Sequence, residues 1–284
     1  MPELPEVGTV RRVLRVQLLG ARFGRSTVLS PETAAHPGAE DFCRALEGRD
    51  VEEVERRGKF LVFRLSGGAR LIVHLRMTGR VLLCPASYPP ERHTRAVMAV
   101  SGGRELRFCD QRRFGRLWLL LPGERDVYSG MENLGPEPFD PALTADYLRS
   151  ALGRRRRAVK ECLMEQGVVA GIGNIYSDEI LFYARIDPRR AACTLEDGDW
   201  RRLAAAIPER LEYFIEKNAI TPEEYLLTGG RDYRNTPYLQ VYGRAGEPCA
   251  LRGDASPRGN RRAEQRLLPP LPGDERVKRK KEKA

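Results

Sequence analysis

The sequence predicts an α+β fold, with β structure in the first half of the chain and helices in the second. Short β-rich runs separated by Gly, Pro and polar turns extend from about residue 21 to residue 123. Between about residues 141 and 226, apolar side chains recur instead at i, i+3 and i+4. The chain has 284 residues, of which 41% are hydrophobic, so it can form one large domain or two ordinary ones with a sizeable core.

The first residues predict an amphipathic helix. Apolar side chains recur with helical spacing at Val7, Val10, Leu14 and Leu18. Pro5 suits the first turn of this helix, and Gly20 suits its end. We therefore expect the helix to hold Pro2 rigidly against a core.

Several β-rich runs follow at short spacing, which is typical of a β-sandwich or a barrel. The runs are FLVFRL (60–65), ARLIVHLRM (69–77), RAVMAV (95–100), ELRFCD (105–110) and GRLWLLL (115–121). The segment LGPEPFD (134–140) then has the composition of a linker.

Three helices are predicted after the linker, over residues 146–166, 174–186 and 200–218. Asn174 stands where the N-cap of the second helix belongs, directly after the glycines of VVAGIGN. From residue 227 onwards the chain is loop-rich, and beyond Cys249 it loses periodicity and ends in a basic run. We expect this last part to be disordered.

The charge balance favours a polyanionic partner, most simply nucleic acid, because the net charge is +10. Residues 250–284 hold eleven Lys/Arg and five Asp/Glu, a net charge of +6, which leaves +4 for the rest of the chain. A nucleic-acid site in the body of the protein therefore depends on local clustering of basic residues.

The six cysteines are scattered without a CxxC pair, which argues against a disulfide framework and against a zinc site. No apolar run approaches the ~20 residues that a membrane span needs. The start of the chain lacks the basic and apolar regions of a signal peptide. These patterns predict a cytoplasmic protein with reduced thiols and no membrane partner.

The stretch MPELPEV places a candidate nucleophile at the start of the chain. Trimming of Met1 leaves Pro2 with a free secondary amine, which can attack an electrophilic sugar carbon and form an iminium ion. Glu3 is the adjacent candidate acid or base. The structural alternative is that a Pro-Glu pair simply begins a helix.

Two further motifs carry candidate phosphate or base contacts. Lys59 in RRGKF lies between a turn glycine and a strand, and His74 and Met77 in HLRMTGR lie at a strand end. Lys59 and His74 suit contacts to phosphate, and Met77 suits an apolar wedge between bases. The structural alternatives are a solvated lysine, a structural histidine and a core methionine.

Arginines and an aromatic residue are adjacent in DQRRFGR, where Arg112 and Phe114 suit stacking together with phosphate or base-edge contact. The alternative is a buried aromatic with solvated flanks. In GIGNIY, a helix N-terminus offers amides to a phosphate, and Asn174 adds a side-chain donor. Because this motif does not follow a strand, it is not a dinucleotide site.

Taken together, these pieces resemble the formamidopyrimidine-DNA glycosylase family, which excises oxidised purines such as 8-oxoguanine. The matching segments occur in the family's order up to about residue 249: MPELPEV, RRGKF, HLRMTG, DQRRFG, LGPEP, GIGNIYSDE and LQVYGRAGEPC. The resemblance implies a β-sandwich with an N-terminal helix (1–134), a helix-two-turn-helix domain (135–239) and a degenerate zinc-finger region with a basic tail (240–284). DNA would lie in the cleft between the first two domains.

The resemblance also implies roles for individual residues. Pro2 would attack the sugar C1′, Glu3 would protonate the ring oxygen, and Glu6 would help to form the pocket for the damaged nucleotide. Lys59, assigned with Pro2 and Glu3 to the catalytic set, would grip the backbone phosphates. The other residues implied to contact DNA are His74 and Asn174 at the phosphates, and Met77, Arg112 and Phe114 in the gap left by the flipped nucleotide.

The implied activity is excision of oxidised purines followed by strand cleavage, by a monomer that acts on damaged duplex DNA near the bacterial nucleoid. No metal or nucleotide cofactor takes part in the implied chemistry. The related endonuclease VIII enzymes, which remove oxidised pyrimidines, share Pro2 and Glu3 but have glycine where Leu4 stands. They also lack the filler residues, the Met/Arg/Phe set that would fill the gap left by the flipped nucleotide. Two alternatives remain: a zinc-free enzyme of that kind, and a lesion-binding protein whose catalysis is impaired.

Three positions depart from the family pattern. The family usually has glutamate where Gly8 stands and glycine where Arg76 stands. It also continues after GEPC as a four-cysteine zinc finger, whereas here Cys249 is the last cysteine, so we expect no structural zinc. The segment RLLPPLPG can be back-translated so that a one-base shift reads VYCPRCQ, which suggests a frameshift after about residue 249.

Overall fold

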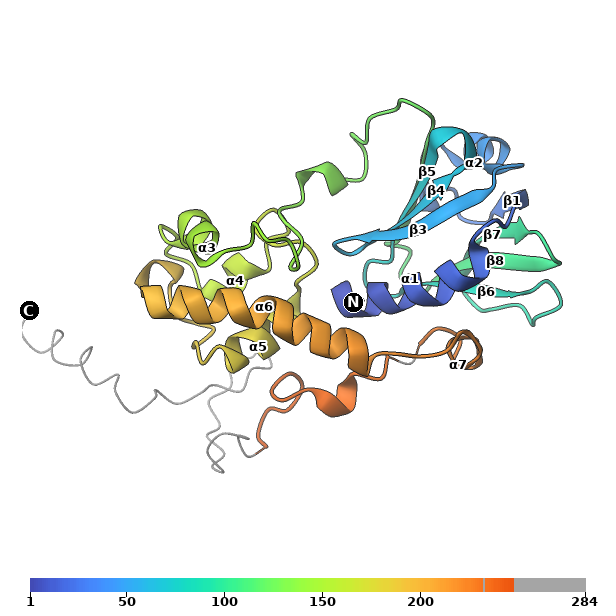
Figure 1. The fold of residues 1–284 in the computed structure, drawn as a ribbon. Coiled ribbons are helices and arrows are strands. Elements are labelled where there is room, and N and C mark those ends of the chain that lie inside the picture. The colour runs from blue at the N-terminus through green and yellow to red at the C-terminus, as the bar shows by residue number, and fades with distance from the viewer. Residues whose placement is uncertain (232, 248–284) are drawn as a thin grey trace, which may run out of the picture.

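The computed structural model describes residues 1–231 and 233–247, which form a β-rich half and a helical half (Figure 1). Helix α1 (Leu4–Leu18) contacts both strand β3 of the β-rich half and helix α6 of the helical half. The first-helix prediction is confirmed, because Pro5 lies in the first turn and the four apolar positions are all buried. Gly20 follows the helix with φ = 73°, a left-handed conformation that suits a helix end.

Two sheets build the β-rich half, and the predicted sandwich is confirmed. One sheet has the strand order β1-β7-β8-β6 and the other has the order β2-β9-β5-β4-β3. Neighbouring strands run antiparallel, except that β2 and β9 are parallel. The strands are β1 (Phe23–Val28), β2 (Ala34–His36), β3 (Val51–Arg57), β4 (Phe60–Leu65), β5 (Ala69–His74), β6 (Gly79–Pro85), β7 (Thr94–Val100), β8 (Arg104–Asp110) and β9 (Arg116–Leu120).

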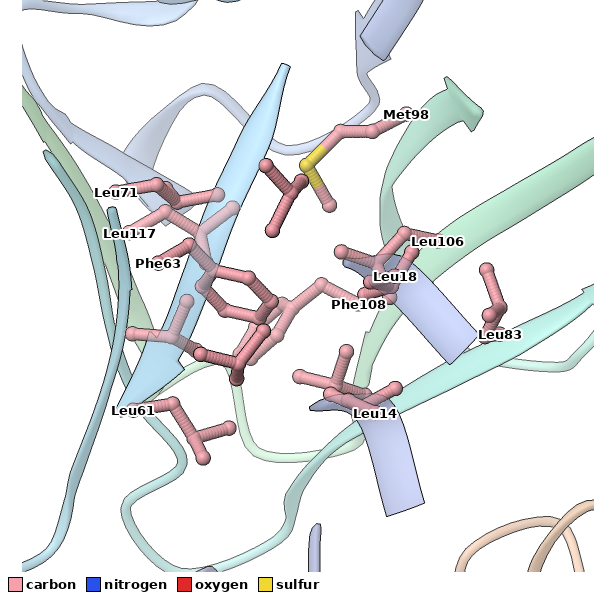
Figure 2. Close-up of a cluster of buried hydrophobic side chains, with 14 of the residues drawn as sticks. Leu14, Leu18, Leu61, Phe63, Leu71, Leu83, Met98, Leu106, Phe108 and Leu117 are labelled. Carbon is pink, nitrogen blue, oxygen red and sulfur yellow. The ribbon is translucent and has the colours of Figure 1, made fainter. Parts of the chain in front are cut away.

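The core of this half lies between the two sheets and is closed by α1. Figure 2 shows Phe63, Leu71 and Leu117 of one sheet approaching Leu106 and Phe108 of the other. Side chains of α1 complete the same cluster on its open side. Burial of large apolar side chains contributes about 1.5–3 kcal/mol each, so this packing fixes the position of α1 and of the chain start in front of it.

The helical half contains α3 (Ala145–Leu152), α4 (Val159–Leu163), α5 (Asn174–Tyr183) and α6 (Asp197–Lys217). The prediction of one continuous helix over 146–166 is wrong, because the chain turns between α3 and α4. Arg155 and Arg157 both form ion pairs with Glu165, which hold this turn folded back on itself. The remaining helices are α2 (Ala39–Leu46) and α7 (Pro222–Leu227), and the short 3₁₀ helices are Pro31–Thr33, Ser66–Gly68, Met131–Asn133, Ala192–Thr194 and Thr236–Tyr238.

After α6 the chain returns to the β-rich half. Tyr225 of α7 is buried in the core cluster of the sandwich, and its hydroxyl donates to the carbonyl oxygen of Val81 at 3.2 Å. The predicted boundaries at residues 134 and 239 therefore stay a prediction, and the finger region beyond residue 247 lies outside the described residues.

In the part of the chain that the structure describes, none of the helices has the length and apolar character of a membrane span.

Candidate active site

The start of the chain is bound to the N-terminus of α5. The carboxylate of Glu3 accepts hydrogen bonds from the backbone N–H groups of Gly173 at 2.8 Å, Ile175 at 3.0 Å and Tyr176 at 3.3 Å. Because Gly173 is the N-cap and Asn174 is already helical, the expectation that Asn174 caps this helix is wrong. These amides are occupied by Glu3, so they do not offer the free phosphate site expected from GIGNIY; the side chain of Asn174 is exposed.

Two glycines allow this close approach. Gly171 has φ = +91°, and a β-carbon there would lie 2.5 Å from the side chain of Leu4, whose N–H donates to the Gly171 carbonyl at 3.1 Å. A β-carbon on Gly173 would lie 2.5 Å from Glu3 Oε1 and 2.7 Å from Lys59 Nζ. Real β-carbons do not approach other atoms so closely. The glycines of GIGN therefore make room for Glu3 and Lys59.

Glu3 and Lys59 are both buried, with 2% and 5% of their surfaces exposed. Burial raises the pKa of Glu3, although the positive charge of Lys59 and the three α5 amides act in the opposite direction. Burial likewise lowers the pKa of Lys59, against the attraction of Glu3 and Glu6. Burial thus makes the uncharged form of each group easier to reach than it is in water.

Glu6 lies on the other side of Glu3 and is also buried. Its Oε2 accepts from the backbone N–H of Glu3 at 2.8 Å, and its Oε1 accepts from the hydroxyl of Tyr176 and from Nδ2 of Asn235. Burial raises the pKa of Glu6, and so does the charge of Glu3, whereas its hydrogen-bond donors lower it. Glu6 thus joins the chain start, α5 and the segment after α7.

His74 is held as a neutral donor. Phe60 pairs with His74 in the β4–β5 ladder, which brings Lys59 close to the histidine. Burial and the nearby Arg76 and Lys59 lower the pKa of His74 from 6.5 to about 3. Nδ1 accepts from the N–H of Arg76 at 3.0 Å, so the proton of the neutral ring is on Nε2, which remains a donor.

The three predicted filler residues lie on two neighbouring loops. Met77 is 43% exposed and Phe114 is 48% exposed, so neither is a core side chain. The guanidinium of Arg112 lies 4.7 Å from the centre of the Phe114 ring. Asp110 anchors both loops, because its carboxylate accepts from the hydroxyl of Thr78 and, at 3.1 Å, from the N–H of Arg112.

A cleft of about 760 Å³ opens beside these residues. Pro2, Glu6 and Met77 line it, whereas the other predicted residues lie outside its lining. The remaining lining comes mainly from β6, the turn before β7 and the segment after α7, and it includes Arg80, Arg92, His93, Arg231, Tyr233, Asn235 and Thr236. Nothing in the sequence pattern marks Asn235, and although Tyr176 and Asp110 belong to the motifs GIGNIY and DQRRFG, their roles arise from contacts between distant segments.

Glu179 joins two of the motifs. Its buried carboxylate accepts hydrogen bonds from the backbone N–H groups of Gln240, Val241 and Tyr242, each at 2.9 Å. These amides belong to LQVYGR, and Glu179 belongs to GIGNIYSDE. A run of consecutive N–H groups is a common anion-binding arrangement, so this contact fixes the described end of the chain against α5.

Pro2 is half-buried and lines the cleft, and the buried Glu3 lies beside Lys59. This chain start, on a β-sandwich followed by a helical domain, is the arrangement of a DNA glycosylase. Residues 1–117 match the family model "Formamidopyrimidine-DNA glycosylase N-terminal domain", and residues 134–224 match the "Formamidopyrimidine-DNA glycosylase H2TH domain". The chain belongs to the formamidopyrimidine-DNA glycosylase family. The resemblance and the fold inferred from the sequence motifs are therefore confirmed.

Individual relatives agree with this assignment. The formamidopyrimidine-DNA glycosylase of Moorella thermoacetica is 46% identical over 249 residues, which are 88% of this chain and 91% of the relative. Among solved structures, the MutM (Fpg) protein of Thermus thermophilus is 36% identical with a TM-score of 0.81, covering 95% of this chain and 97% of that one. Lactococcus lactis Fpg bound to Fapy-dG containing DNA is 30% identical with a TM-score of 0.83, covering 94% and 97%.

The zinc finger that the resemblance implies does not fit this chain. Cys249 is the one cysteine after Cys193, so the donor set of a four-cysteine site is incomplete. Within residues 1–231 and 233–247, no group of three or more His, Cys, Asp or Glu side chains is arranged to hold a metal. The predicted disorder and frameshift of the tail lie outside the described residues, and the absence of zinc stays a prediction.

Proposed function

We propose that this protein is a bifunctional DNA glycosylase and AP lyase that removes oxidised purines, such as 8-oxoguanine and formamidopyrimidines, from duplex DNA. The observation that carries the proposal is the buried carboxyl of Glu3, which directly follows Pro2 and lies close to Lys59. The named relatives are formamidopyrimidine-DNA glycosylases, and the Lactococcus lactis neighbour binds Fapy-dG containing DNA. We expect a monomer that works on DNA in the bacterial cytoplasm.

The proposed reaction begins when removal of Met1 turns the nitrogen of Pro2 into a secondary amine. The amine attacks C1′ of the damaged nucleotide, the glycosidic bond breaks, and the base leaves with the bonding electron pair and takes up a proton. After the amine proton is lost, its lone pair expels the ring oxygen, which is protonated by Glu3, and an iminium ion forms. The iminium then promotes elimination of the 3′ and the 5′ phosphate.

The environment of Glu3 supports its role as the acid. Burial raises the pKa of Glu3, which favours the protonated form that a general acid requires. Lys59, 5% exposed, adds a cation beside the reacting sugar. The proposed chemistry uses the terminal amine and side chains of the protein and no metal or nucleotide cofactor.

The remaining residues are proposed to hold the DNA. Lys59, the Nε2 donor of His74 and the exposed Asn174 would contact phosphates around the lesion. The exposed side chains of Met77 and Phe114, with Arg112 stacked on Phe114, would fill the space left when the nucleotide leaves the helix. Phosphate contacts of this kind make binding strongly salt-dependent.

Borohydride trapping tests the proposal. Protein with a processed N-terminus is incubated with duplexes that contain 8-oxoguanine or an oxidised pyrimidine, and the reductively trapped protein–DNA adduct is measured. We expect an adduct on 8-oxoguanine and much less of it with Pro2→Gly, because a terminal glycine carries a less nucleophilic primary amine without the rigid proline ring. Protein that retains Met1 should also give much less, because the nitrogen of Pro2 is then an amide and cannot attack.

Other outcomes identify the alternatives. An adduct that forms only on the oxidised pyrimidine indicates an endonuclease VIII-like enzyme, and a solved Lactococcus lactis neighbour with DNA containing an oxidised pyrimidine makes that comparison worthwhile. Lesion binding without any adduct or base release indicates a binding protein, and contradicts the proposed enzyme.

A further inference from the structure

One side chain connects the wall of the cleft to the nucleophile. Tyr233, Asn235 and Thr236 line the cleft from the segment after α7. Asn235 is 5% exposed, and its Nδ2 donates both to Glu6 Oε1 and to the hydroxyl of Tyr176. It therefore touches the cleft and a buried hydrogen-bond network at the same time.

The network ends at Pro2. Tyr176 also donates to Glu6 Oε1, and Glu6 Oε2 accepts from the N–H of Glu3 at 2.8 Å. That N–H belongs to the peptide group that joins Pro2 to Glu3, so Glu6 fixes the plane of this peptide and with it the direction of the proline ring. Three donors converge on the Glu6 carboxylate, and loss of one leaves it less firmly placed.

We propose that Asn235 is a positioning residue that aligns Pro2 through Glu6 for displacement of the base. This inference rests on the proposed function and deepens it. Displacement of a base requires attack in line with the leaving bond, so it is sensitive to small changes in the position of the nucleophile. An abasic site presents an aldehyde that already lacks its base, so imine formation there demands less of the alignment.

The titratable groups that face Glu6 are Glu3 and Lys59 from the β-rich half, Tyr176 from α5 and Tyr233 from the segment after α7. Asparagine and aspartate have the same shape, but the amide donates a hydrogen bond at every pH and the carboxyl does so only while it is protonated. In Asn235→Asp, the new carboxyl can therefore donate to Glu6 while it is protonated. Once ionised, it opposes the Glu6 carboxylate and the network separates.

The experiment measures single-turnover rates of Asn235→Ala, Asn235→Asp and Tyr176→Phe on two duplexes, one with 8-oxoguanine and one with a preformed abasic site. We expect Asn235→Ala and Tyr176→Phe to slow base release at least tenfold and to leave cleavage of the abasic site within twofold. Asn235→Asp should shift the pH profile of base release toward acid, whereas Asn235→Ala should lower the rate of base release at every pH.

Asn218→Ala is the matched control. Asn218 is a buried asparagine that donates to Thr9 Oγ1 at 3.0 Å, away from the cleft lining, so its loss should lower stability and leave the ratio of the two rates unchanged. Equal slowing on both duplexes by Asn235→Ala, or no slowing on either, overturns the inference. Failure of the unmodified protein on both duplexes would instead reject the proposed function.

Discussion

At Gly173 the absence of a side chain is what allows the site to form. The position of a β-carbon there is already taken by the carboxylate of Glu3 and the ammonium group of Lys59. Neither group can move aside, because Glu3 is held by three amides of α5 and both are buried. A glycine at position 173 is thus required for Glu3 and Lys59 to lie side by side.

Gly173→Ala should therefore reduce base excision by roughly 100-fold, since small displacements of reacting groups have effects of that size. Single-turnover excision of 8-oxoguanine measures it. Gly8→Ala is the control, because a β-carbon on Gly8 meets nothing within 4 Å. That change in a helix interior should leave excision unaltered and raise stability by up to ~1 kcal/mol; an unimpaired Gly173→Ala variant would contradict the close packing of the site.

Arg76 departs from the family's usual glycine at a position where the backbone favours glycine. Its φ is 54°, a left-handed conformation that costs other residues roughly 1–2 kcal/mol. The same turn places the N–H of Arg76 on His74 Nδ1. The protein therefore keeps the turn that fixes the histidine ring, with an arginine that adds positive charge near the proposed DNA surface.

At the scale of elements, the strands that the sequence predicts are the central ones. β4, β5, β7, β8 and β9 each have a neighbour on both sides, and the β-rich runs of the sequence predict all five. The four strands that those runs do not include, β1, β2, β3 and β6, are the edges of the two sheets. The central strands β4 (FLVFRL) and β9 (RLWLL) are buried along nearly their whole length and form continuous apolar runs. The edge strand β3 (VEEVERR) carries charges beside its few buried positions, so it leaves a weaker signal.

Two carboxylates tie helix α5 to other parts of the chain, Glu3 at the N-terminus of the helix and Glu179 in its second turn. Glu3 occupies the amides at its N-terminus, and Glu179 on the helix binds three amides of the segment 240–242. The element therefore fixes the chain start and the described chain end relative to each other.

Glu179→Gln tests this anchoring. The amide side chain has one acceptor where the carboxylate has two, and its NH₂ group opposes the backbone donors. We expect a loss of about 1–3 kcal/mol in the free energy of unfolding, measured by urea denaturation. The exposed Glu212→Gln should lose almost nothing; equal stability of the two variants would show that the segment is held by other contacts.

At the scale of the whole molecule, the two halves are joined by exchange of elements. Helix α1 lies between β3 and α6, and α7 returns from the helical half to the sandwich (Figure 1). Because the segment that carries Asn235 follows α7, the seating of α7 sets the distance between Asn235 and Glu6.

Tyr225→Ala should thus weaken both stability and excision. Removal of a large buried aromatic side chain costs about 3–5 kcal/mol, and it releases the helix that precedes Asn235. Thermal unfolding and base excision measure the two effects. Leu227→Ala in the same helix is the control, because Leu227 is 84% exposed and its loss should change neither stability nor excision. Unchanged excision in a destabilised Tyr225→Ala variant would show that the position of α7 does not affect the site.

The sequence by itself determined the first helix and the central strands, because apolar periodicity is a local property of a chain. Its short motifs also supplied the candidates Pro2, Glu3, Lys59 and His74, whose roles stay a proposal. It predicted one helix across residues 146–166, since ion pairs to Glu165 that fold the turn back leave no periodic signal. Only the tertiary structure decided that Glu3 occupies the α5 amides and that Asn235 meets Glu6. These contacts join residues 170 and 229 positions apart, and such a pairing is fixed by the packing of whole elements.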